Sequence, residues 1–245
     1  MRSHDRQHLF LVLGTLLAAV AFASPARADT QAGSYGDRTL DGRTHNFLMP
    51  TGELVPAGDA VVQVHELGMY NSVALGLTDR FEVSAAVPII PLFTILHARM
   101  GLLPPSSNLR LVVGGGVLLP LIGDDDKDSP RGWEASATLA YHTPKMNLHV
   151  TMTALGSTGA GDDTVSGILT GGVTLKIGRK VALMADVVKI RDGCDVGSAP
   201  VVGIKLMGEH FDTDLGLVFL SFDDEKADGG SFDVALPVIS MSYRY

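Results

Sequence analysis

The chain has 245 residues, 46% of them apolar, with a mean hydropathy of +0.24 and a formal net charge of −8. This acidic balance argues against a nucleic-acid partner, because nucleic-acid binding depends on a basic surface. The single cysteine, Cys194, excludes an internal disulfide framework, and its polar surroundings favour a free loop thiol over an intermolecular bridge.

Residues 1–28 have the pattern of a cleavable secretory signal. A basic start at Arg2 and Arg6 precedes a mostly apolar run over residues 9–23. The small-x-small sequence Ala26-Arg27-Ala28 then provides a cleavage site, and a retained N-terminal anchor is the weaker alternative. Cleavage removes three arginines and one aspartate, which takes the formal net charge from −8 to −10.

Residues 29–58 are mostly polar and end in the phrase PTGELVPAG. We interpret this stretch as an extended periplasmic leader segment that contains no plug domain of useful size. The structured domain is expected to follow it, over residues 59–245.

From residue 59 onward the sequence divides into twelve short apolar segments, and no uninterrupted apolar run could cross a bilayer as a helix. Apolar residues spread over many short segments favour a closed barrel, because only helices and closed barrels satisfy every backbone group in lipid. A soluble exported β-sandwich is the competing interpretation. The predicted strands span 59–67, 70–77, 81–88, 92–101, 108–120, 132–142, 146–155, 164–177, 180–190, 199–208, 212–222 and 231–245.

Short and long connections alternate from the fourth predicted strand onward. Outer-membrane barrels have short periplasmic turns and longer external loops, whereas a sandwich has no reason to separate loops by length. The long connections are acidic or rich in glycine, but they lack the spacing of a calcium-binding loop, so solvated loops are favoured. They span 121–131, 156–163, 191–198 and 223–230.

The segments alternate apolar and polar residues, as expected for strands with one face toward lipid. In the sixth segment, Trp133 and Tyr141 share the apolar face and are spaced about 20 Å apart along the membrane normal, which suits two interfacial aromatic belts. The last segment ends on an aromatic residue, Tyr245, and resembles the closing strand of bacterial outer-membrane barrels. We expect the barrel-assembly machinery to act through it.

The stretch PTGELVPAGDAVVQVHELGMYNSVALGLTDRFEVSAAVPI, residues 50–89, resembles the opening hairpins of small Gram-negative outer-membrane barrels. Its turn Gly76-Leu77-Thr78-Asp79-Arg80 is similar to that of the phenol-degradation (meta-pathway)-associated outer-membrane protein family. The resemblance implies a channel-like or uncharacterised outer-membrane protein and carries over no catalytic residues.

The polar faces of the strands predict the lining of a lumen. Twelve strands enclose more space than side chains alone fill, so small residues on part of the wall favour a narrow aqueous path. The alternative is that the charges pair across the lumen and seal it. The predicted lumen-lining residues are Glu82, His97, Arg99, Arg110, Glu134, His149, Lys176, Asp186, Lys205 and Asp214.

No catalytic, cofactor or metal site is expected from the sequence. His142 and His149 flank one turn, but nothing indicates converging ligands or a supporting second shell. A membrane-embedded lipase would need a nucleophile motif, which is missing, so we expect that the chain is not an enzyme.

The sequence therefore predicts an all-β transmembrane, antiparallel up-and-down β-barrel of about 12 strands in the outer membrane of a Gram-negative bacterium. The expected function is porin-like transport through a narrow passive channel for small solutes. The alternative is a closed barrel with a structural or interaction role through its acidic external loops. Expected partners are outer-membrane lipid and lipopolysaccharide, the barrel-assembly machinery and small solutes.

Overall fold

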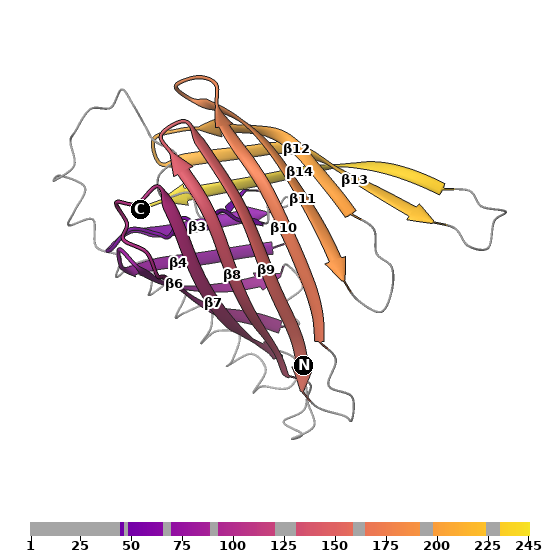
Figure 1. The fold of residues 1–245 in the computed structure, drawn as a ribbon, viewed down its shortest axis with the longest axis horizontal. Helices are drawn as coiled ribbons and strands as arrows, with labels where there is room; N and C mark the ends of the chain where they lie inside the picture. Colours follow the sequence, from indigo (N-terminus) through magenta and orange to yellow (C-terminus); the bar gives the residue numbers. More distant parts are fainter. Residues whose placement is uncertain are drawn as a thin grey trace, which may run out of the picture.

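Twelve antiparallel strands close into a single barrel (Figure 1). The computed structural model describes residues 45–46, 49–65, 70–88, 93–120, 131–158, 165–191, 198–223 and 231–245. A separate pair of short strands, β1 (His45–Asn46) and β2 (Met49–Pro50), precedes the barrel. The barrel strands are β3 (Ala60–His65), β4 (Tyr70–Thr78), β5 (Phe81–Pro88), β6 (Phe93–Gly101), β7 (Leu109–Pro120), β8 (Arg131–Thr143), β9 (Met146–Thr158), β10 (Val165–Lys176), β11 (Val181–Arg191), β12 (Ser198–Met207), β13 (Phe211–Asp223) and β14 (Ser231–Arg244).

The topology is that of an up-and-down barrel. Each strand pairs with the next along the chain, and β14 pairs with β3 to close the wall. The predicted all-β, twelve-stranded antiparallel barrel is thus confirmed, and every predicted strand bound lies within three residues of the observed one. The competing sandwich is wrong because the sheet closes on itself.

Side chains along each strand alternate between the outside and the inside of the barrel. In β9, Met152 is 67% exposed, whereas its neighbour Thr151 is 1% exposed and faces inward. The Thr151 hydroxyl lies 2.8 Å from that of Thr138 on β8, so a polar contact joins the two strands on the inner face. The wall therefore separates an apolar outside from a polar inside.

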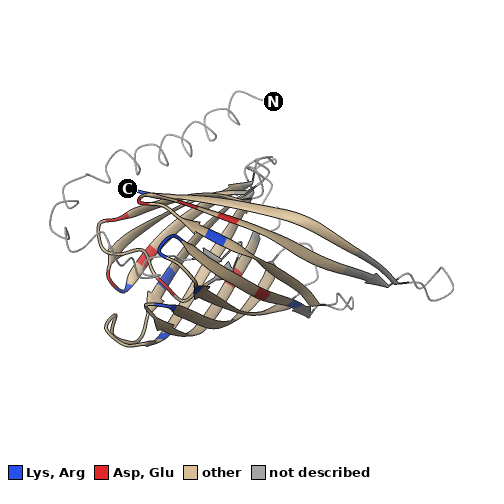
Figure 2. Ribbon diagram, turned by 90° about the horizontal axis from the view of Figure 1, so that it is seen from above, with Lys and Arg blue, Asp and Glu red and all other residues tan. Residues whose placement is uncertain are grey.

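Large apolar side chains cover the outer surface of the barrel. Trp133 and Tyr141 are both exposed on the same face of β8, as the predicted aromatic belts require. Figure 2 shows that charged residues occupy few positions along the strands. A contiguous apolar surface of this kind is typical of a lipid-facing band and not of a soluble monomer. Other members of this surface are Leu96, Leu139, Leu148, Leu169, Leu183, Val202 and Leu217.

The turns described between β4 and β5, β8 and β9, β10 and β11, and β12 and β13 lie at one end of the barrel, which we name the short-turn end. The C-terminus lies at the same end, where the backbone amide of Tyr245 donates to the carbonyl of Ala60 at 2.9 Å. Within the described residues, no helix is both long enough and apolar enough to cross a membrane.

Several predicted features fall outside the described residues. These are the signal at 1–28, the first part of the leader at 29–44, the greater part of each long connection, and Cys194.

Candidate functional site

The segment Thr51–Gly58, which we name the inner segment, lies inside the barrel at its short-turn end. Thr51, Glu53 and Val55 are buried, with Val55 fully inaccessible. The inner segment belongs to no strand and leads directly into β3. We expected residues 29–58 to be a leader segment without a plug domain of useful size, and within the described part of it Thr51, Gly52, Glu53 and Val55 are buried.

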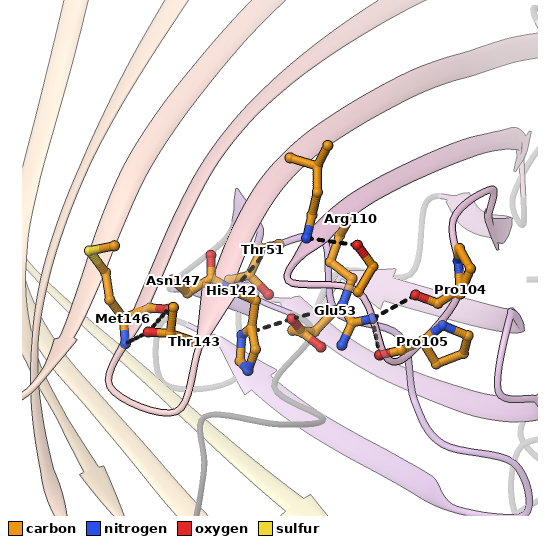
Figure 3. Close-up of polar contacts among 11 residues, drawn as sticks. Thr51, Glu53, Pro104, Pro105, Arg110, His142, Thr143, Met146 and Asn147 are labelled. Atoms are coloured by element: carbon orange, nitrogen blue, oxygen red, sulfur yellow. Dashed lines mark hydrogen bonds and ion pairs between the residues drawn. The ribbon is translucent and has the colours of Figure 1, made fainter.

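Glu53 connects the inner segment to the barrel wall (Figure 3). Its Oε1 lies 2.9 Å from Nδ1 of His142 on β8 and 3.8 Å from Nε of Arg110 on β7. Beside it, the side-chain amide of Asn147 donates to the carbonyl of Thr51 at 3.2 Å. A buried carboxylate thus meets two groups that can carry positive charge, as buried charges require.

Arg110 is itself held in place by the loop that precedes β7. Its guanidinium Nη1 donates to the carbonyl of Pro104 at 3.2 Å and also to the carbonyl of Pro105. These contacts, drawn in Figure 3, fix the head group near Glu53. Because the loop residues lie at the short-turn end, the cluster sits at the mouth of the barrel and not at its centre.

Glu82 provides a second attachment point for the inner segment. Its Oε2 accepts a hydrogen bond from the backbone amide of Val55 at 2.8 Å, and its Oε1 accepts one from Nη1 of Arg99 at 3.0 Å. Glu82 and Arg99 are opposite each other in the register of β5 and β6, and both are buried. A charge-assisted hydrogen bond of this kind is stronger than a neutral one.

The wall is shaped to admit the inner segment. A Cβ at Gly76 would collide with the carbonyl oxygens of Val55 and Pro56, so only glycine allows this close approach. Asp79, in the adjoining turn, accepts a hydrogen bond from the backbone amide of Ala57 at 3.2 Å. The glycine and the aspartate of the sequence Gly-Leu-Thr-Asp-Arg therefore both hold the inner segment.

Further inside, ionisable side chains meet between the neighbouring strands β12 and β13, and across β10 between β9 and β11. Nζ of Lys205 lies 3.0 Å from Oδ1 of Asp214, which faces it across β12 and β13. Nε2 of His149 lies 3.6 Å from Oδ1 of Asp186, and the Asp186 carboxylate occupies the space that a Cβ at Gly172 would need. All four side chains are buried, so water does not reach these groups.

The interior is more accessible toward the end opposite the short turns. Nε2 of His97 lies 3.3 Å from Oε1 of Glu134, and the two side chains are 16% and 28% exposed. Gly114 and Gly116 make room for the imidazole, because a Cβ at either position would come within 3.0 Å of the His97 ring. Water therefore reaches His97 and Glu134, in contrast to the buried His149 and Asp186.

The structure places the ten predicted lumen-lining residues at different depths. Six are buried in the interior, namely Glu82, Arg99, His149, Asp186, Lys205 and Asp214, and four are partly exposed, namely His97, Arg110, Glu134 and Lys176. Their role as the lining of a solute path stays a prediction. Sequence reasoning missed Glu53 and Asn147, although the lone carboxylate between the two glycines of PTGELVPAG offered a signal for Glu53.

A closed barrel with an apolar outside and a polar inside is a transmembrane β-barrel of the outer-membrane type. No known protein family matches the chain, and no curated protein matches it. The resemblance to the phenol-degradation-associated family therefore stays a prediction.

Solved structures with similar folds are outer-membrane barrels. The NanC porin is 10% identical, with 76% of this chain and 98% of that chain covered and a TM-score of 0.49. Outer-membrane expressed OmpT of Vibrio cholerae is 14% identical, with coverages of 72% and 64% and a TM-score of 0.41. LpxR from Salmonella typhimurium is 10% identical, with coverages of 76% and 99% and a TM-score of 0.37. These similarities are too distant to assign a function.

The expectation that the chain is not an enzyme was wrong, because it excluded enzymatic activity without sufficient ground. Function depends on the site and not on the fold, so the barrel fold does not by itself exclude catalysis. The exclusion also relied on a missing nucleophile motif, yet strand pairing brings Oγ of Ser240 within 2.9 Å of Nδ1 of His65. Hydroxyl–imidazole contacts of this kind occur in nucleophilic catalysis, and sequence spacing does not show them.

Proposed function

We propose that the protein is a narrow passive channel for small solutes in the outer membrane. The observation that supports it best is the partial exposure of His97 and Glu134 inside the barrel. Polar side chains that only filled the interior would be buried, as Asp186 and Lys205 are. Water-accessible polar side chains on a wall with small neighbours are suited to line a path for small polar solutes.

The location follows from the same chemistry. The signal at residues 1–28 would export the chain, and the apolar outer surface would contact outer-membrane lipid and lipopolysaccharide. In this proposal, β14 is the strand through which the assembly machinery inserts the barrel. With an even number of strands, both ends of the barrel sequence lie at the short-turn end, which we assign to the periplasm.

A closed barrel with a structural or interaction role is the second candidate. The pairs Lys205–Asp214 and His149–Asp186 favour it, because their side chains are buried in the interior and not exposed to water. In that case the acidic external loops would provide the interaction surface.

Planar-bilayer recording separates the two candidates. A channel gives stepwise current from folded protein, whose folding is checked by heat-modifiable migration in gels. Glu134→Ala and Arg110→Ala should each change the current, because both side chains border the path. Glu209→Ala in the exposed turn after β12 is the matched control. No steps from folded protein would favour the closed barrel, and unchanged current in both variants would contradict the lumen assignment.

A further inference from the structure

The inner segment has the properties of a ligand held by the barrel. Residues 51–58 belong to no strand and are held by separate contacts to β4, β5, β7, β8, β9 and the turn at Asp79. Gly52 and Gly58 have φ values of +81° and +84°, so a flexible residue lies near each end of the segment. A Cβ at Gly58 would meet nothing within 4 Å, so side chains do not pack around this end of the segment, which is held by a backbone hydrogen bond from Gly58 to Gly76.

Glu53 supplies the charge by which this internal ligand is recognised. Its carboxylate is buried next to His142 and Arg110, which come from two neighbouring strands of the wall. Arg110 is positioned by the carbonyls of Pro104 and Pro105, whose contacts do not depend on Glu53. The imidazole and the guanidinium are therefore arranged on the wall, and the carboxylate is brought to them by a separate piece of chain.

We propose that His142 and Arg110 form a carboxylate-binding site in the short-turn mouth, occupied in this conformation by Glu53 of a displaceable inner segment. Solutes that carry a carboxylate compete with Glu53 for this site and release the segment. The biological role of this site rests on the proposed channel function, because release of the inner segment would open the mouth. Binding of a carboxylate to the site can be measured without recording current.

The test uses a thiol reporter in the inner segment. Cys194→Ser removes the native thiol, and Val55→Cys places a small side chain at a fully buried position. The rate of modification by a charged methanethiosulfonate reagent then reports release of the segment in folded protein. Leu54→Cys is a second reporter if the first does not give heat-modifiable protein.

Three comparisons are decisive. Adding Glu53→Gln to the reporter should raise the modification rate about tenfold or more, the range expected when a hydrogen bond to a charged group is lost. Glu209→Gln, in an exposed turn, should leave the rate unchanged. Sodium acetate should raise the rate above that in sodium chloride of equal ionic strength, acetamide should not, and acetate should have no effect once Glu53→Gln is present.

Equal rates with and without Glu53→Gln would overturn the proposal, and so would equal effects of acetate and acetamide. Bilayer recording of the same variants separates this result from the channel function. Faster modification in Glu53→Gln without current in any variant supports the site and contradicts the channel. Current that is identical in the parent and Glu53→Gln, with equal modification rates, supports the channel and contradicts the site.

Discussion

Lys205 and Asp214 face each other across β12 and β13, with Nζ of the lysine 3.0 Å from Oδ1 of the aspartate and both side chains buried. Replacing one partner of a buried ion pair leaves the other charge without compensation, at a cost of about 3–5 kcal/mol. We therefore expect Lys205→Met to lower the free energy of unfolding by that amount, measured by urea titration in lipid vesicles. The double variant Lys205→Met/Asp214→Leu should recover most of the loss. A single variant as stable as the parent would show that the pair is solvated.

Gly76→Ala should disturb the inner segment without touching a charge. The added methyl group would meet the backbone of Val55 and Pro56, and forcing atoms into a packed site typically costs about 1–3 kcal/mol. Gly167→Ala on β10 is the control, because a Cβ there would meet nothing within 4 Å. Unfolding in lipid vesicles should show a loss for the first variant and none for the second, and equal losses would contradict the assigned contact.

A charged residue on the outer face should lower the free energy of unfolding, and the loss should be greater the deeper the residue lies in the membrane. Met152 lies at the middle of β9, whereas Ile177 follows the end of β10 at the short-turn end, and both are well exposed on the outside. Met152→Lys should cost about 2–4 kcal/mol and Ile177→Lys about 0–1 kcal/mol. The unfolding free energies in vesicles test this, and equal costs would mean that the apolar surface does not face lipid as assigned.

Asp59, just before β3, gives a prediction about pH. Burial raises the pKa of its carboxyl from the ordinary value of 3.8, and the charge of Arg244 partly opposes this rise. The folded state therefore binds the proton more tightly than the unfolded state, so ionised Asp59 weakens folding at neutral pH. This loss is recovered as the pH falls through the raised pKa toward 3.8.

Asp59→Asn should accordingly be slightly more stable than the parent at pH 7, and the difference should disappear below the unfolded-state pKa. Urea midpoints at neutral and acidic pH provide the measurement. If the stability of the parent relative to Asp59→Asn does not rise as the pH falls, the carboxyl is solvated.

The barrel wall was predictable from the sequence because period-two alternation and turn residues are local. Pairing inside the lumen was not, because it depends on which strands become neighbours and in what register. His142 and His149 illustrate this: they flank one turn, but the register places His142 opposite Asn147 and His149 opposite Ala140. Each imidazole then meets an acid from elsewhere, Glu53 or Asp186.

The inner segment was not predictable for a related reason. Its residues have no periodicity, and its burial is supplied by side chains distant in sequence. Thr51 is held by Asn147, 96 residues further along the chain, and Val55 by Glu82, 27 residues away. These groups come together only in the closed barrel. From the sequence alone, a polar stretch before the first strand is therefore interpreted as a leader.

The pairing of β14 with β3 sets an order of assembly. His65 and Ser240 are 175 residues apart, so closing this seam joins the two ends of nearly the whole domain. The loop-closure entropy of such a step is about 4–5 kcal/mol, which makes it a late event in folding. Because the inner segment runs straight into β3, the closed interior that surrounds it is complete only once this seam has formed.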